Sequence, residues 1–389
     1  MKPRFVEGNA VRLLENGAEY FPALVEAIDS ATSEVHLESY IFANDDAARA
    51  VVDALIRARQ RGSEIRVLVD GFGAPDFRDQ LGADLIAADC EVMIYRAKVA
   101  KQRFRRNRLR RLHRKLVVID GRIAFVGGLN IIADTTDTDP EFPRHDYALC
   151  VEGPLVADIH NAVRHLWRLV RWAYLGKRPE APAAIKMDCK SCGLTRAAFL
   201  VRDNLRHRRD IEDAYLDAIE AARAEVLIAC AYFLPGKRFR RALIEAAQRG
   251  VNIVLLLQSR GDHAILRNAE RHLYRELLPA GICIIEYHSG FLHAKVGVVD
   301  QQWATVGSSN IDPFSLLLSR EANVVIDDAD FTATLRARLQ SAINIGGRQV
   351  QIADMNNLSW WSQLVNRTAY AFVRFAVSVS HYGGKDYRE

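Results

Sequence analysis

One sequence pattern occurs twice in this chain, and it constrains the fold more than any other feature. Residues 113–130 read HRKLVVIDGRIAFVGGLN, and residues 293–310 read HAKVGVVDQQWATVGSSN. Histidine, lysine, aspartate, glycine and asparagine recur at identical offsets in the two copies. Two copies with every internal offset preserved indicate a duplicated structural unit rather than a chance match.

The first copy predicts two short buried strands, at 116–119 and 123–126, joined by a tight Asp-Gly turn. Side chains alternate along an extended chain, so His113 and Lys115 project from the same face. The second strand ends in two glycines, where backbone and ligand can approach closely, and Asn130 follows. We therefore expect a histidine, a lysine and an asparagine to converge at one end of the strand pair.

Apolar and turn patterns predict alternating strands and helices around each copy. Strands are expected at 34–42, 65–70, 91–95, 225–233, 251–258 and 282–287. Helices are expected at 45–61, 77–88, 210–224, 238–249 and 264–279, and residues 10–29 are expected to form a turn and then a helix. This alternation predicts an α/β fold of two tandem duplicated domains. Each domain would be a mixed sheet flanked by helices, with the two related by a pseudo-twofold axis and the site at their interface.

The length of 389 residues exceeds that of one ordinary core. We expect an N-terminal domain at 1–176, a linker at 177–197, a C-terminal domain at 198–345 and an amphipathic C-terminal segment at 346–389. Six cysteines do not predict a disulfide framework at this length, and the lone C-x-x-C of Cys189 and Cys192 is interpreted as a reduced pair in the linker. No signal-peptide core and no apolar run of about 20 residues is present, which favours a cytoplasmic chain.

Each half offers a histidine for acid–base or nucleophilic work, a positive charge and an amide donor. Neither half contains paired carboxylates at catalytic spacing, a nucleophile elbow or a Gly-x-x-x-x-Gly-Lys phosphate loop. Two lysines and two asparagines around two histidines suit an anionic group with several oxygens. A phosphodiester is the obvious candidate.

A mechanism follows from the presence of two histidines, His113 and His293. One attacks phosphorus and forms a phosphohistidine, and the other protonates the leaving alkoxide and later deprotonates the incoming nucleophile. Positive and amide groups would stabilise the non-bridging oxygens, so that neither a metal nor another cofactor is expected. These groups are Lys115, Lys295, Asn130 and Asn310.

Four carboxylates accompany the motifs. Asp146 and Glu321 each open a predicted strand downstream of a motif, and we assign them to orienting the histidines. An exposed acid before a strand is the alternative interpretation. Asp120 and Asp300 lie a full strand away from the histidines, and on physical grounds a turn or buried ion-pair role is favoured.

The doubled His-x-Lys-x4-Asp pattern, with its Gly-Gly/Ser-x-Asn ending, resembles the phospholipase D superfamily over nearly the whole chain. More narrowly, the chain resembles the bacterial cardiolipin synthases of the B type, which lack transmembrane helices. The stretches that support this are LLENG at 13–17, DGFGAPD at 70–76, WATVGSSNIDP at 303–313 and EANVV at 321–325.

The resemblance implies phosphatidyl transfer between two phosphatidylglycerol molecules, giving cardiolipin and glycerol. It adds Asp120 and Asp300 to the catalytic residues, adds Ser308 to the phosphate-binding residues, and implies that His113 is the nucleophile. Gly128 departs from the family, because many members have serine there. Two alternatives remain: a phospholipase D or other phosphodiesterase that uses water, and a non-catalytic membrane-binding protein, against which the complete motifs argue.

Three segments suggest how a lipid substrate is reached. The basic run at 101–115 is interpreted as membrane-binding, at about 1 kcal/mol per Lys or Arg near an anionic bilayer. A solvated loop and nucleic-acid binding are its alternatives. The basic amphipathic stretch 164–172 and the apolar segment after Trp360 suit a membrane interface or packing within the protein. We expect phosphatidylglycerol and an anionic membrane surface as partners, no nucleic acid, and a peripheral location on the cytoplasmic face of the cell membrane.

Overall fold

A computed structural model describes residues 3–96, 111–135, 141–175, 190–203, 207–260, 264–313, 315 and 319–379. Most of the basic run, Cys189 and most of the expected linker lie outside these residues. Cys192 is an exposed free thiol. Within the described ranges, no helix has the length and apolar character needed to cross a membrane.

The N-terminal half alternates strands and helices as its sequence indicates. Its strands are β1 (Val6–Glu15), β2 (Glu34–Ser39), β3 (Glu64–Asp70), β4 (Glu91–Tyr95), β5 (Lys115–Ile119), β6 (Ile123–Gly127), β7 (Arg144–His145) and β8 (Tyr147–Glu152). Its helices are α1 (Asn16–Asp29), α2 (Asp46–Gln60), α3 (Leu81–Ala87) and α4 (Val156–Leu175). The strands predicted around the first motif are thereby confirmed as β5 and β6.

The C-terminal half repeats this series and then adds a terminal extension. Its strands are β9 (Thr195–Arg202), β10 (Glu225–Cys230), β11 (Asn252–Gln258), β12 (Cys283–Tyr287), β13 (Phe291–Leu292), β14 (Lys295–Val299), β15 (Trp303–Gly307), β16 (Glu321–Asp327) and β17 (Gly347–Gln349). Its helices are α5 (Asp210–Ala221), α6 (Lys237–Gln248), α7 (Ala264–Leu277), α9 (Ala329–Gly346), α10 (Ile352–Asn356) and α11 (Trp360–Val379).

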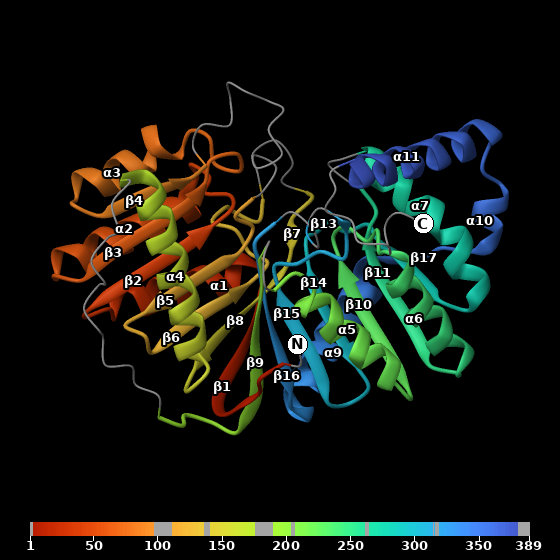
Figure 1. Cartoon of the computed structure of the whole chain (residues 1–389), viewed down its shortest axis with the longest axis horizontal. Coiled ribbons are helices and arrows are strands. Elements are labelled where there is room, and N and C mark those ends of the chain that lie inside the picture. The colour runs from red at the N-terminus through yellow and green to blue at the C-terminus, as the bar shows by residue number, and fades with distance from the viewer. Residues whose placement is uncertain are drawn as a thin grey trace.

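The strand order displays the duplication directly. From the centre outward, the N-terminal half runs β1-β8-β6-β5-β2-β3-β4 and the C-terminal half runs β9-β16-β15-β14-β10-β11-β12, with β17 added at its outer edge. The outer strands of each half pair in parallel and the inner strands pair antiparallel. Figure 1 shows the two halves side by side, with helices over both sheets. The predicted α/β class, with mixed sheets in two related halves, is confirmed.

The two central strands were not predicted. β1 pairs antiparallel with β9, so that all the described strands except β7 and β13 form one 15-stranded sheet. The expected linker end at 197 therefore falls inside a strand. The side-chain amide of the buried Asn9 donates to Val6 O and Thr195 O where the register between β1 and β9 shifts.

A shared apolar core also joins the halves. One cluster of buried side chains includes Leu116 and Leu149 of the first half together with Val296 and Val324 of the second. Because these residues belong to both repeats, neither half can bury all its apolar surface alone.

Asp120 and Asp300 close the turns at the far ends of β5 and β14, with φ of 52° and 51°. The Asp120 carboxylate accepts hydrogen bonds of 2.8–2.9 Å from the backbone N–H groups of residues 32–34. The Asp300 carboxylate accepts bonds of 2.8–3.0 Å from residues 223–225. A strand of this length holds Asp120 about 16 Å from the histidine end. Both carboxylates hold the chain entering β2 and β10, and we propose that this structural role, rather than catalysis, is their function.

We expect Asp120→Ala to lower the free energy of unfolding by about 2 kcal/mol, because backbone donors lose their acceptor. Turnover per folded molecule should stay within about twofold of the wild type. Urea denaturation measures the stability, and turnover at a matched folded fraction measures the activity. The control is Asp53→Ala, at an exposed position of α2. A large loss of turnover at unchanged stability would return Asp120 to the catalytic group.

Candidate active site

A pocket of about 560 Å³ lies where the two halves meet. His113 and Asn130 line it from the first half, and His293 and Asn310 line it from the second. The short strands β7 and β13 pair in parallel beside it, and Figure 1 shows them adjacent between the halves. The two motif ends predicted separately from the sequence thus meet in one cavity.

Each histidine ring is bonded to a carboxylate of the opposite half. His113 Nδ1 lies 3.0 Å from Glu321 Oε2, and His293 Nδ1 lies 2.5 Å from Asp146 Oδ2. A carboxylate can only accept, so we assign the proton to each Nδ1. The Nε2 lone pair is then free to face the pocket. The structure places Asp146 and Glu321 where a histidine-orienting role requires them. Each carboxylate, however, bonds the histidine of the other repeat.

The backbone of each histidine is held by the same segments. The N–H of His113 donates to Arg320 O at 3.0 Å, and the N–H of His293 donates to His145 O at 2.8 Å. Each acceptor is the residue immediately before the carboxylate that holds the ring. One short segment of the opposite half therefore positions both the main chain and the imidazole of each histidine.

The two motif lysines are buried beside the histidines. Lys115 Nζ donates to His113 O at 2.8 Å, and Lys295 Nζ donates to His293 O and lies 3.6 Å from Asp146 Oδ2. Burial lowers the pKa of Lys115 to about 7 and also lowers the pKa of Lys295. An anion that enters the pocket would favour the charged forms of both lysines.

Burial also lowers the pKa of both histidines, and that of His293 well below its usual value. Both imidazoles are therefore neutral near pH 7 in the empty pocket. A neutral imidazole has the lone pair that a nucleophile or a general base needs.

The amide and hydroxyl groups occupy different positions. The N–H of Ile41 donates to Asn130 Oδ1 at 3.0 Å, which leaves the amide NH₂ of Asn130 as the donor for a ligand. Asn310 also lines the pocket. Ser308 is fully buried, and its Oγ donates to Glu321 Oε2 at 2.6 Å. Ser308 therefore supports the carboxylate of Glu321, and we propose that this support, rather than contact with a phosphate, is its role.

Gly128 occupies the position equivalent to Ser308 for a steric reason. A Cβ built on Gly128 would lie 2.3 Å from Asp146 Oδ1. Aspartate is one methylene shorter than glutamate, so the Asp146 carboxylate lies closer to its own strand than that of Glu321. Glycine is needed here because the carboxylate fills the space of a side chain.

Aromatic residues of the site were missed in the sequence. The Tyr40 ring lies edge-on to His113 with centroids 5.0 Å apart, and the Phe291 ring stacks with His293 at 6.0 Å. Tyr232 also lines the pocket. Tyr40 and Tyr232 closely follow the parallel strands β2 and β10, and strand ends of this kind are where α/β proteins bind ligands. Their position at the ends of predicted strands is the sequence feature that could have identified these two tyrosines.

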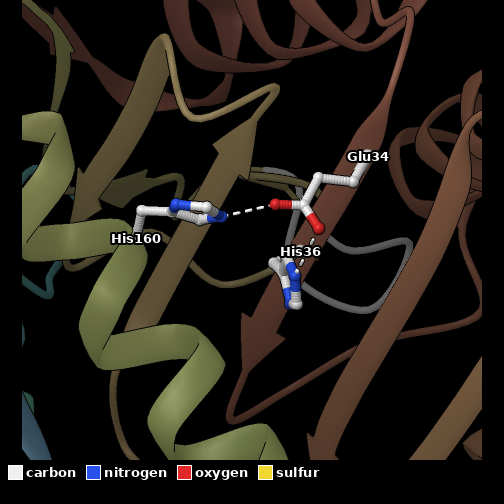
Figure 2. A group of neighbouring side chains, drawn as sticks. All are labelled: Glu34, His36 and His160. Atoms are coloured by element: carbon white, nitrogen blue, oxygen red, sulfur yellow. Dashed lines mark hydrogen bonds and ion pairs between the residues drawn. The ribbon is translucent and has the colours of Figure 1, made fainter. Parts of the chain in front are cut away.

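A second cluster of ionisable groups lies away from this pocket. Glu34 and His36 of β2 and His160 of α4 place their ligand atoms within 4.8 Å of one another, and Figure 2 shows Glu34 contacting both imidazoles. The Arg66 guanidinium lies 2.9 Å from Glu34 Oε2 and 3.4 Å from His36 Nε2. A metal cation placed there would face this guanidinium, so we interpret the cluster as a buried ion-pair network.

Comparison with known proteins identifies the family. The family model "Cardiolipin synthase, PLD-like domain" matches residues 24–167 and 215–343. The chain is 40% identical over 384 residues to cardiolipin synthase B of Escherichia coli K12, covering 96% of this chain and 90% of that protein. The chain belongs to the PLD-like cardiolipin synthase family. It is also 31% identical over 338 residues to the probable cardiolipin synthase YwiE of Bacillus subtilis, covering 85% of this chain and 65% of that protein.

A solved structure supports the fold of this cardiolipin synthase family member. Phosphatidylserine synthase of Haemophilus influenzae superposes with a TM-score of 0.66 at 14% identity, covering 95% of this chain and 94% of the other. At that identity the likeness is evidence for the fold alone.

We expect the protein to take up protons when an oxyanion binds in the pocket at pH 8. The Lys115 amine, with its pKa of about 7, is mostly neutral in the empty pocket at this pH, and the anion favours the ammonium form. Calorimetry of tungstate binding in buffers of different ionisation enthalpy counts the protons. Lys115→Met should lower the uptake, whereas Lys237→Met, at an exposed position, should not. Equal uptake in Lys115→Met and wild type would contradict the assignment.

We expect Gly128→Ala to reduce turnover at least tenfold, about 1.4 kcal/mol in activation free energy. The new methyl group must displace the Asp146 carboxylate, and His293 then loses its acceptor. Ser308→Ala is the comparison variant: it removes a hydroxyl donor from Glu321 without crowding the carboxylate, so its loss of turnover should be smaller. Initial rates, with circular dichroism to verify folding, distinguish the variants. Wild-type turnover in Gly128→Ala would contradict the steric argument.

Proposed function

We propose that this chain is a cardiolipin synthase that transfers a phosphatidyl group between two phosphatidylglycerol molecules and releases glycerol. The main support for the proposal is the pair of histidines, each bonded to a carboxylate of the opposite half. His113 and His293 each have Nδ1 bonded to a carboxylate, and both line one pocket. Two catalytic nitrogens facing one anion-binding cavity suit a two-step transfer at phosphorus. Relatives named cardiolipin synthase B support this choice of reaction.

In the first step, His113 Nε2 attacks the phosphorus of the donor lipid. The bond from phosphorus to the glycerol headgroup oxygen breaks, and that oxygen takes a proton from His293. The Glu321 carboxylate stabilises the positive charge that develops on His113. The incoming phosphate anion raises the pKa of His293, so that it can hold the proton it donates.

In the second step, His293 Nε2 removes a proton from a headgroup hydroxyl of a second phosphatidylglycerol. The resulting oxygen attacks phosphorus, the bond to His113 breaks, and cardiolipin forms. In both steps Lys115 and Lys295 favour negative charge on the non-bridging oxygens, and the amide groups of Asn130 and Asn310 donate to them. We assign the attack to His113 from the family resemblance, since the two histidines have equivalent bonds.

The pocket wall favours lipid substrates. Beyond the polar site, the wall is built from apolar side chains of α7, β13 and α11: Ile265, Leu266, Phe291, Phe372, Val373 and Ala376. Such a wall suits the glycerol backbone and the first acyl carbons of a phospholipid. We propose that the enzyme acts as a peripheral protein at the anionic cytoplasmic face of the cell membrane. The alternative function is a hydrolase that uses water, instead of a second lipid, as the acceptor.

We expect the purified enzyme to convert phosphatidylglycerol vesicles into cardiolipin and glycerol in equal amounts. Mass spectrometry of the lipids and an enzymatic glycerol assay measure both products. The double variant His113→Ala/His293→Ala is the control. Formation of phosphatidic acid and glycerol without cardiolipin would favour the hydrolase.

A second experiment separates the roles of the two histidines. His293→Ala should retain turnover of a donor whose leaving group is p-nitrophenol, which needs little protonation, whereas His113→Ala should not. Alkaline quenching of the His293→Ala variant should trap the phosphatidyl label on His113. Label on His293 in the wild type would reverse the assignment.

A further inference from the structure

Helix α11 packs on the C-terminal half through one face. Asn366 and Val373 are buried, and Ala369 and Tyr370 pack against the core of this half. The His272 ring of α7 lies 4.9 Å from the Tyr370 ring. Figure 1 shows α11 lying along the rim of the C-terminal half and extending toward the centre of the molecule.

The opposite face of α11 is apolar and exposed. Its apolar residues recur at the spacings that bring side chains to one face of a helix. We name them the α11 stripe; they are 43–67% exposed and comprise Trp360, Trp361, Leu364, Val365, Phe372 and Phe375. A contiguous exposed stripe of large apolar side chains marks a surface that binds a membrane or another protein.

A basic groove lies beside the stripe, between α7 and α11. Its volume is about 490 Å³, and His272, Arg275 and Arg367 line it together with Trp360 and Leu364 of the stripe. Burial lowers the pKa of His272, and the positive charges of Arg275 and Arg367 lower it further. An apolar face with cationic groups at its edge, and tryptophans at one end, matches the interface of an anionic bilayer.

The other end of α11 belongs to the active-site pocket. Phe372, Val373 and Ala376 line the cavity that also contains His113 and His293. Phe372 is part of both the stripe and the pocket wall, so the pocket opens beside the stripe. On the opposite side of the pocket, the first half also has an exposed aromatic ring: Phe72 is 57% exposed and stacks 4.5 Å from Arg111.

We propose that α11 lies in the interface of an anionic phospholipid bilayer, with the α11 stripe among the acyl chains and the basic groove against headgroup phosphates. The active-site pocket then opens onto the lipid surface. A substrate keeps most of its acyl chains in the bilayer while its phosphate reaches His113 and His293. The proposal rests on the proposed function, which makes phospholipids the substrate. A second copy of the chain is disfavoured as the occupant, because facing basic grooves would repel each other.

Vesicle binding tests the docking surface. The variant Trp361→Glu/Leu364→Glu places two charges in the stripe and leaves the pocket wall intact. Its partitioning onto phosphatidylglycerol vesicles, measured by sedimentation, should fall at least tenfold. The control Leu194→Glu, at a residue 97% exposed just before β9, should bind within twofold of wild type. Arg367→Gln should weaken binding to anionic but not to neutral phosphatidylcholine vesicles. Unchanged binding of the double variant would overturn the proposal.

Two further measurements separate docking from other roles. The double variant should lose at least tenfold in rate on vesicle phosphatidylglycerol and stay within about twofold on a monomeric short-chain phosphatidylglycerol. Equal losses on both substrates, or a change from dimer to monomer in light scattering, would show that the stripe serves packing or self-association and would overturn the proposal. Stripe-dependent vesicle binding by a wild-type protein that forms no cardiolipin would instead support docking and overturn the proposed function.

Discussion

The crossed bonds between each histidine and the carboxylate of the other half are the interaction on which the structure depends. Asp146 and Glu321 are buried, and a buried carboxylate is costly unless a partner compensates it. That partner, His293 or His113, comes from the opposite repeat. The site therefore exists only when the halves are docked, and the β1–β9 pairing and the shared core hold them so.

The two repeats use different side chains to position the carboxylate that holds each histidine. In one, a serine hydroxyl supports a glutamate, as Ser308 does for Glu321. In the other, a shorter aspartate fills the space that a serine would need, and Gly128 leaves that space open. The departure from the family pattern is thus compensated within the same site. Each carboxylate still reaches the Nδ1 of its histidine, so the chemistry can remain equivalent while the packing differs.

Burial determines the electrostatics of the pocket. Removing Lys115 and Lys295 from water lowers the pKa of both ammonium groups, and the same effect keeps both histidines neutral. A phosphodiester brings the missing negative charge, so binding and protonation are coupled. The apolar wall of the pocket is partly formed by α11, which links the substrate pocket to the surface that we propose meets the membrane.

The sequence by itself determined the duplication, the α/β class and the local elements, because these follow from short-range periodicity and turn residues. β4, for example, has the bounds expected from the sequence. It also indicated the turn role of Asp120, since a residue one strand away cannot reach the site. Only the tertiary structure decided that β1 and β9 join the sheets, and which acid serves which histidine. Those outcomes depend on strand pairing between distant segments, and the local pattern of either segment contains no information about its partner.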